Sequence, residues 1–202
     1  MEPNGRERLA FTGTDHRGLR VLLWATAFVV VAVELIAPVI SGIVRDPIRA
    51  TVHTEVTVDG LAPGVTVANP ADVLVVIADP TMSQRLLVAL PSALVGVAVL
   101  VVVRHLLGLL GDLRGGEPFT VANVRRLRGI AVVVGTGAIV VSAAEALCDF
   151  VLVADGALGA GARQVFEMSL SLAFLAVALV IAAIAEAYRV GVRLRDDVDG
   201  LV

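Results

Sequence analysis

Four long apolar blocks constrain what this 202-residue chain can fold into. A helix that crosses the hydrocarbon core of a membrane needs about 20 mostly apolar residues. The sequence predicts such spans at about 21–44, 86–110, 129–154 and 168–188. Only 17% of the residues are charged, against about a quarter in soluble proteins, which excludes an ordinary soluble domain. We therefore predict an all-α transmembrane fold, a four-helix membrane bundle that forms a single integral membrane domain over residues 1–202.

The distribution of arginine predicts the orientation of this bundle. All sixteen basic residues are arginines, and twelve of them lie in the N-terminal tail, around the loop 111–128 or in the C-terminal tail. Cytoplasmic loops carry an excess of basic residues in membrane proteins. We therefore expect both termini and the loop 111–128 to be cytoplasmic, in a multi-pass protein of a bacterial inner or plasma membrane. The segments 45–85 and 155–167 would then lie outside.

The segment between the first two spans predicts a small extracytoplasmic β insert, residues 45–85. Residues 49–59 alternate between apolar and polar side chains, which is typical of a half-buried strand. A short second strand is expected over 65–68, and the continuous apolar run 73–78 predicts a more buried strand. Three short strands cannot form a core of their own, so we expect them to pack on the helix ends or on another chain. The insert is either a structural lid or a cap that binds a ligand or partner.

The cytoplasmic loop 111–128 contains a helix stop followed by a helix start. Gly115 and Gly116 end one helix, and Thr120 is a good N-cap for the next. Phe119 is predicted to form a hydrophobic staple with Val124. The loop is therefore either a capped helix start with basic anchors or a docking surface. The candidate docking residues are Glu117, Pro118, Phe119, Asn123, Arg125, Arg126 and Arg128.

Ionisable residues inside the spans are functional candidates, because charge is costly in hydrocarbon. Glu34 and Glu145 are expected roughly 20 and 24 Å above the cytoplasmic edge, from a rise of 1.5 Å per residue. Asp149 follows Glu145 by one helical turn, and Arg85 is the expected counter-charge. These four residues predict an outward-facing polar pocket for a cation, a proton or a polar ligand. The alternative is an interhelical hydrogen-bond network.

Other features set limits on function. Glu186 and Arg189 are predicted to form an ion pair at the exit of the last helix. The single cysteine, Cys148, and three scattered histidines give no metal or haem spacing, so we expect no catalytic site, no cofactor and no enzymatic activity. The net charge of −3 argues against direct binding of nucleic acid. Small residues within the spans permit close helix packing or a homo-oligomer face: Gly96, Gly135, Gly137, Ser142, Ala178 and Ala182.

Three short motifs carry a resemblance to a known family. They are Gly116-Glu-Pro-Phe-Thr-x-x-Asn-Val-Arg-Arg-Leu-Arg128, Ala185-Glu-Ala-Tyr-Arg-Val-Gly191 and Leu194-Arg-Asp-Asp197. Together they resemble a bacterial family of small four-span membrane proteins, classified as a domain of unknown function. The resemblance implies four spans, an insert after the first span and both termini inside. It also implies a relation to a cytoplasmic helix-turn-helix regulator, because many relatives are encoded beside one.

These observations leave several functions open. The first is a membrane sensor or anchor partner of a cytoplasmic transcription regulator. The second is a small transporter or channel component that uses Glu34 and Glu145. The third is an assembly subunit of a larger membrane complex, which the small residues would serve.

Overall fold

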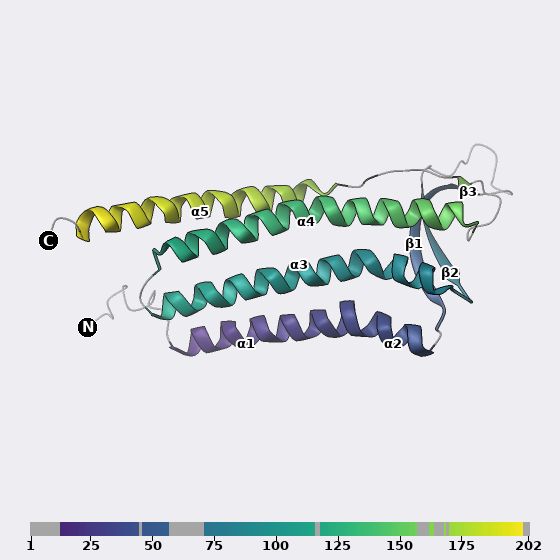
Figure 1. Cartoon of the computed structure of the whole chain (residues 1–202), viewed down its shortest axis with the longest axis horizontal. Coiled ribbons are helices and arrows are strands. Elements are labelled where there is room, and N and C mark those ends of the chain that lie inside the picture. The colour runs from purple at the N-terminus through teal and green to yellow at the C-terminus, as the bar shows by residue number, and fades with distance from the viewer. Residues whose placement is uncertain are drawn as a thin grey trace, which may run out of the picture. The chain divides into compact units, whose positions relative to one another are not determined.

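The computed structural model of the chain describes residues 13–44, 46–56, 71–115, 118–156, 162–163, 168 and 170–199. Its elements, in chain order, are α1 (Gly13–Val30), η2 (Val31–Ile36), α2 (Ala37–Val44), β1 (Ile48–Val56), β2 (Ala71–Ile77), α3 (Met82–Arg114), α4 (Val121–Ala154), β3 (Ala162–Arg163) and α5 (Leu172–Asp199) (Figure 1). The expected strand at 65–68 and the candidate docking residue Glu117 lie outside the described residues.

Four helical segments in the described part of the chain are long and apolar enough to cross a membrane. They cover Arg17–Val44, Met82–Arg114, Val121–Ala154 and Leu172–Val198. The predicted mostly helical membrane fold, with a small sheet after the first helix, is therefore confirmed. The helices are longer than the apolar blocks: α3 has 33 residues and α4 has 34. At 1.5 Å per residue each measures roughly 50 Å, against a hydrocarbon core of about 30 Å, so both extend beyond the apolar layer. The last helix begins at Leu172, after the predicted start of the span at 168.

The first membrane-length helix changes its winding in the middle. The segment η2 is π-helical, contains Glu34 and ends shortly before Pro38. Proline has no N–H group to donate to the carbonyl four residues earlier, which here belongs to Glu34. A π-helical turn is a common way to accommodate such a break. Glu34 therefore lies where the helix is irregular, next to Gly96 of α3, whose added Cβ would be 3.1 Å from the Cβ of Glu34.

Both ends of the connection between α2 and α3 are fixed by local hydrogen bonds. Thr81 and Gln84 form a capping box: the Gln84 amide donates to Thr81 Oγ1 at 3.3 Å, and the Thr81 amide donates to Gln84 Oε1 at 3.0 Å. Arg85 of the same helix donates to the carbonyls of Ser41 at 3.2 Å and Asp46 at 3.0 Å. The Ser41 carbonyl lies in the last turn of α2 and the Asp46 carbonyl just beyond it, where a cation also interacts favourably with the helix dipole.

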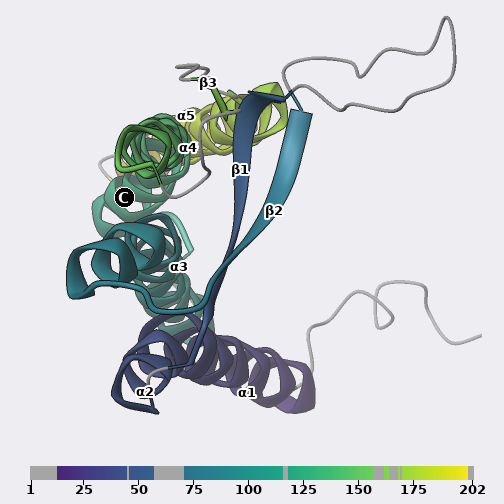
Figure 2. The ribbon, with the colours of Figure 1, turned by 90° about the vertical axis from the view of Figure 1, so that its right-hand side faces the viewer.

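The strands form an antiparallel sheet in the order β2-β1-β3. β1 and β2 pair from Ile48 with Ile77 to Thr54 with Ala71, and Figure 2 shows the two strands side by side. β3, from the segment before α5, pairs with the end of β1 through Glu55 with Arg163 and Val56 with Ala162. The sequence predicts β1 and β2 but not β3.

One face of the sheet packs on helices and the other is open. Ala50 and Val52 of β1 form a core with Cys148 and Leu152 of α4, and Val52 is completely buried. Partly buried apolar residues surround this core: Val75, Ile77, Leu87, Val88 and Val153. The expectation that 73–78 is a buried strand is wrong, because Leu74 is 66% and Val76 is 57% exposed. The sheet covers the helices with one face only, so alternate side chains of β2 point away from the core.

The chain divides into two compact units. The unit that contains the sheet, here called the sheet unit, comprises Val31–Val97 and Thr136–Leu175. The unit that contains the connection between α3 and α4, here called the loop unit, comprises Met1–Val30, Ala98–Gly135 and Ala176–Val202.

Candidate functional site

A cleft of about 430 Å³ in the sheet unit lies between β1 and the helices α3 and α4. Charged and polar side chains from β1, β2, α3 and α4 line it: Arg49, Thr51, His53, Asp72, Ser92, Ser142, Glu145 and Asp149. Pro91 and Val88 of α3, and Ala50, Ala146 and Cys148, supply its apolar wall. A pocket of this size, with a few convergent polar groups on an apolar wall, is typical of a small-molecule site.

The cleft is held together by hydrogen bonds that connect the sheet to α4. The backbone amide of His53 donates to Asp149 Oδ2 at 3.1 Å. The Nδ1 atom of the same histidine lies 2.8 Å from Asp72 Oδ1 on β2. His53 therefore joins both strands to a carboxylate of the helix. The Asp72 side chain is 74% exposed, so the contact with the imidazole contributes little to stability even if the ring is charged.

Two of the four residues of the predicted polar pocket meet in this cleft. Glu145 and Asp149 both line it, one turn apart on α4. Arg85 instead binds the end of α2, and Glu34 lies against Gly96; neither is among the described lining residues. The predicted pocket did not include the other polar residues of the cleft, among them His53 and Asp72. The alternation within the first strand placed His53 on its polar face, but only the pairing of β1 with β2 brings it to Asp72.

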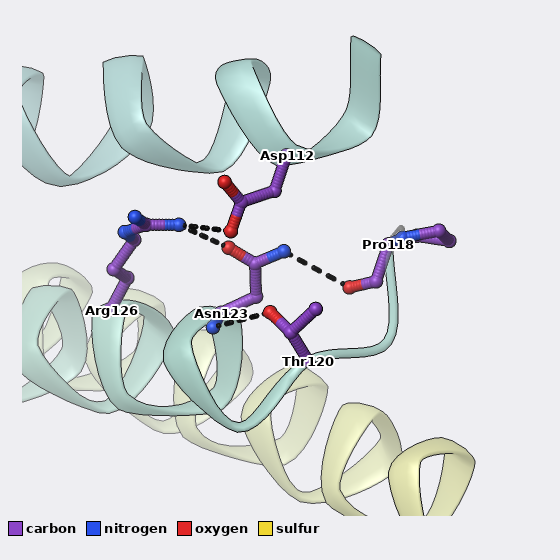
Figure 3. Close-up of polar contacts among 5 residues, drawn as sticks. All are labelled: Asp112, Pro118, Thr120, Asn123 and Arg126. Atoms are coloured by element: carbon purple, nitrogen blue, oxygen red, sulfur yellow. Dashed lines mark hydrogen bonds and ion pairs between the residues drawn. The ribbon is translucent and has the colours of Figure 1, made fainter. Parts of the chain in front are cut away.

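The connection between α3 and α4 in the loop unit is an ordered polar network (Figure 3). The Asn123 amide N–H donates to Thr120 Oγ1 at 3.2 Å, which confirms Thr120 as the N-cap of α4. The Asn123 side chain donates to the Pro118 carbonyl at 3.1 Å and accepts from Arg126 Nη1 at 2.6 Å. The same Arg126 nitrogen donates to Asp112 Oδ2 of α3 at 2.6 Å. Asn123 is completely buried, so this candidate docking residue belongs to the packed interior.

Phe119 packs on α5. Its ring centroid lies 5.3 Å from that of Tyr188 with an interplanar angle of 49°, a favourable tilted arrangement. A Cβ added to Gly191 would lie only 2.6 Å from Phe119 Cδ1, so glycine at 191 lets the ring approach the helix. The ring remains 42% exposed. No motif or spacing in the sequence predicts this contact, and the staple of Phe119 with Val124 stays a prediction.

Three arginines of α4 and α5, Arg125, Arg128 and Arg189, differ in their ion-pair partners. Glu186 and Arg189 form a two-pronged ion pair at the predicted helix exit, with Arg189 Nε 2.8 Å from both carboxylate oxygens. Arg128 of α4 lies 3.6 Å from Glu186 and links α4 to α5. Arg125 is exposed, and in the described part of the chain it has no ion-pair partner.

The described residues contain no group of three or more His, Cys, Asp or Glu side chains placed to hold a metal ion. Two of the small residues of the spans serve packing within the chain. Gly96 meets Glu34, and a Cβ on Gly135 would lie 3.4 Å from that of Ala178 on α5.

Comparison with known proteins identifies the family of this chain. A family model described as a protein of unknown function (DUF2975) matches residues 65–202, more than half of the chain. The chain belongs to the DUF2975 family. This confirms the resemblance to a family of unknown function, and the matched range includes β2, the last three long helices and β3. No curated protein and no solved structure matches the chain.

Proposed function

We propose that this DUF2975 protein is a membrane sensor whose sheet-unit cleft binds a small cationic ligand on the outer side of a bacterial cell membrane. The proposal rests mainly on the surroundings of Glu145. This residue lies in an apolar span, lines the cleft beside Asp149, and has no hydrogen-bond or ion-pair partner among the described residues. An ionisable group in a membrane helix marks a functional site by default.

The charges of the cleft favour a cation. Among the described residues that line it, three carry carboxyl groups, Asp72, Glu145 and Asp149, and one, Arg49, carries a guanidinium group. A cationic group that reaches Glu145 would supply the counter-charge that Arg85 does not. The small serines of α3 and α4, Ser92 and Ser142, leave room for it beside the carboxyl groups.

The cytoplasmic part of the proposal concerns a helix-turn-helix regulator. α4 is one continuous helix that carries Glu145 of the cleft and Arg125 of the loop connection. The exposed Arg125 and the half-exposed Phe119 ring are the surface through which a regulator would be contacted. Asn123 and Arg126 would hold that surface in shape through the buried network.

The orientation is tested by cysteine labelling of intact cells. In a Cys148→Ala background, Asp79→Cys is expected to react with a membrane-impermeant maleimide, and Arg114→Cys only after the cells are opened. Both positions are exposed in the structure. Labelling of Arg114→Cys in intact cells would reverse the orientation and remove the proposal.

The sensor function is tested by gene expression together with gentle affinity purification from native membranes. Glu145→Gln is expected to fix the expression response in one state, while Asp155→Asn, a matched exposed carboxyl outside the cleft, leaves it unchanged. Phe119→Ala with Arg125→Ala is expected to lose a co-purifying cytosolic regulator. If that pair of substitutions changes neither expression nor recovery of a regulator, the sensor function is wrong. Recovery of several membrane proteins instead would indicate an assembly subunit.

The alternative of a transporter has one observation in its favour, the π-helical turn that places Glu34 against α3. A cation path would need polar groups further along the span, yet α3 has no charged residue from Leu86 to Val103. Cation flux into proteoliposomes that Glu34→Gln and Glu145→Gln each abolish would replace the sensor by a transporter. Absence of flux with the unmodified protein would remove the transporter.

A further inference from the structure

We infer that a groove between α3 and α4 in the loop unit is a binding site for a phosphate group, that of an anionic phospholipid. The groove has a volume of about 650 Å³. It is separate from the ligand cleft of the sheet unit. It shares Arg125 with the surface proposed to contact a regulator, but lipid binding in the groove does not depend on the sensor function.

The groove is built from one stripe of each helix. On α3, Arg104, His105 and Gly108 follow one another at helical spacing, and on α4 Ala122, Arg125 and Arg126 do the same. Residues three and four apart share a helix face, so the arginines and the histidine converge on the same space. No acidic residue is among the described residues that line it.

Glycine and alanine keep this space open. A Cβ on Gly108 would lie 2.7 Å from Arg126 Nε, so the guanidinium passes directly over the α3 backbone. On the other side, His105 Nε2 would lie 3.0 Å from a Cβ on Gly129. Ala122 adds only a methyl group at the groove. A larger side chain at Gly108 or Gly129 would displace these cations.

The charge of the groove is unbalanced. Asp112 neutralises Arg126 through the 2.6 Å contact described above. Arg104 and Arg125 have no carboxylate partner in the part of the chain that the structure describes. Two free guanidinium groups beside an imidazole match the oxygens of a phosphate group, which guanidinium binds in a two-pronged way.

The position of the groove favours a lipid as the source of that phosphate. Arg104 is the first charged residue after an uncharged run that begins at Leu86, and Val101 at the end of that run also lines the groove. Eighteen residues at 1.5 Å each span about 27 Å, close to the thickness of the hydrocarbon core. The groove therefore lies at headgroup level, where basic pockets between helices bind anionic lipids. An acyl chain would continue along the apolar face of α3.

The first experiment measures lipid retention by native mass spectrometry in neutral detergent. The unmodified protein is expected to retain phosphatidylglycerol over phosphatidylcholine. Arg104→Gln with Arg125→Gln should weaken that retention roughly twenty-five-fold, at about fivefold for each arginine. Arg17→Gln with Arg114→Gln removes the same charge from two exposed arginines outside the groove and should change nothing. Equal retention of the two lipids, or equal losses in both double variants, would overturn the site.

A second pair of variants keeps every arginine in place. Ala122→Glu adds a carboxylate within reach of Arg125 and Arg126, whereas Ala122→Gln adds the same volume without charge. Phosphatidylglycerol retention should fall in Ala122→Glu below that of Ala122→Gln; equal retention contradicts the inference.

Thermal unfolding with either phosphatidylglycerol or inorganic phosphate added distinguishes a lipid from a soluble compound as the source of the phosphate group. Protection by phosphatidylglycerol alone supports the lipid, and loss of this protection in Arg104→Gln with Arg125→Gln assigns it to the groove. Equal protection by inorganic phosphate would keep the phosphate site but replace the lipid by a soluble phosphate compound.

Discussion

Arg126 of α4 lies 2.6 Å from the carboxylate of Asp112 on α3, and both side chains are less than one-third exposed. The same guanidinium nitrogen also reaches the buried side chain of Asn123. The turn between the two helices therefore depends on one polar network that begins in α3, passes through Asn123 and ends at the Pro118 carbonyl. Removing a central member should affect the whole connection, because buried polar groups that lose partners are costly.

Asn123→Ala tests that dependence. The substitution leaves the Pro118 carbonyl and part of the Arg126 guanidinium without their partner, so we expect a loss of about 1–3 kcal/mol in the free energy of unfolding. Val121→Ala, an exposed apolar residue in the same turn, should change stability by less than about 0.5 kcal/mol. Unfolding in mixed detergent measures both. Equal effects of the two substitutions would mean that the network adds nothing to stability.

Thr120 tests the helix cap separately. Thr120→Ala removes the oxygen that accepts the Asn123 amide and should cost about 1 kcal/mol, whereas Thr120→Ser keeps the hydroxyl and should cost a few tenths at most. The same unfolding measurement compares them. A serine variant as unstable as the alanine variant would assign the effect to the lost methyl group.

The features that could be predicted from the sequence are those with local causes. Apolar length predicts the four membrane helices, and the hydroxyl of Thr120 before an apolar run predicts its cap. The Thr81-x-x-Gln84 capping box has an equally local cause, a hydroxyl and an amide three residues apart at the start of α3. The partner of Arg85 is different: charge predicts the carboxyl groups of Glu34, Glu145 and Asp149, whereas in the fold Arg85 donates to the carbonyls of Ser41 and Asp46.

Contacts between distant segments could not be read from spacing. β3 adds to the sheet through a two-residue pairing across more than a hundred residues of chain. Phe119 meets Tyr188 only because α5 passes beside the start of α4 in the loop unit. Neither pairing leaves a periodic signal, since each depends on where a single side chain or peptide group is placed by the tertiary fold.

The contact of Phe119 with α5 predicts a substitution whose effect changes sign. Gly191→Ala should destabilise the protein by about 1–3 kcal/mol, because the new methyl group displaces the Phe119 ring. In a Phe119→Ala background the clash is absent, and Gly191→Ala should instead stabilise the helix by up to about 1 kcal/mol. Gly18→Ala in α1, where nothing lies within 4 Å of the added Cβ, serves as the control and should stabilise in both backgrounds. Additive effects of Gly191→Ala and Phe119→Ala would contradict the contact.

The connection between the sheet and α4 predicts a change in backbone dynamics. The His53 amide donates to Asp149, so Asp149→Ala should expose this amide and increase its hydrogen exchange by about tenfold or more, in line with 1.5–3 kcal/mol for a hydrogen bond to a charged group. Asp149→Asn retains an oxygen acceptor and should preserve most of the protection. Glu145→Ala, which removes the neighbouring cleft carboxyl without touching this bond, should leave exchange over residues 48–56 unchanged. Hydrogen exchange followed by mass spectrometry resolves this peptide. If Glu145→Ala raises the exchange of β1 as much as Asp149→Ala does, the cleft as a whole stabilises the strand. The single bond between His53 and Asp149 would then not be what fixes the sheet to the helix.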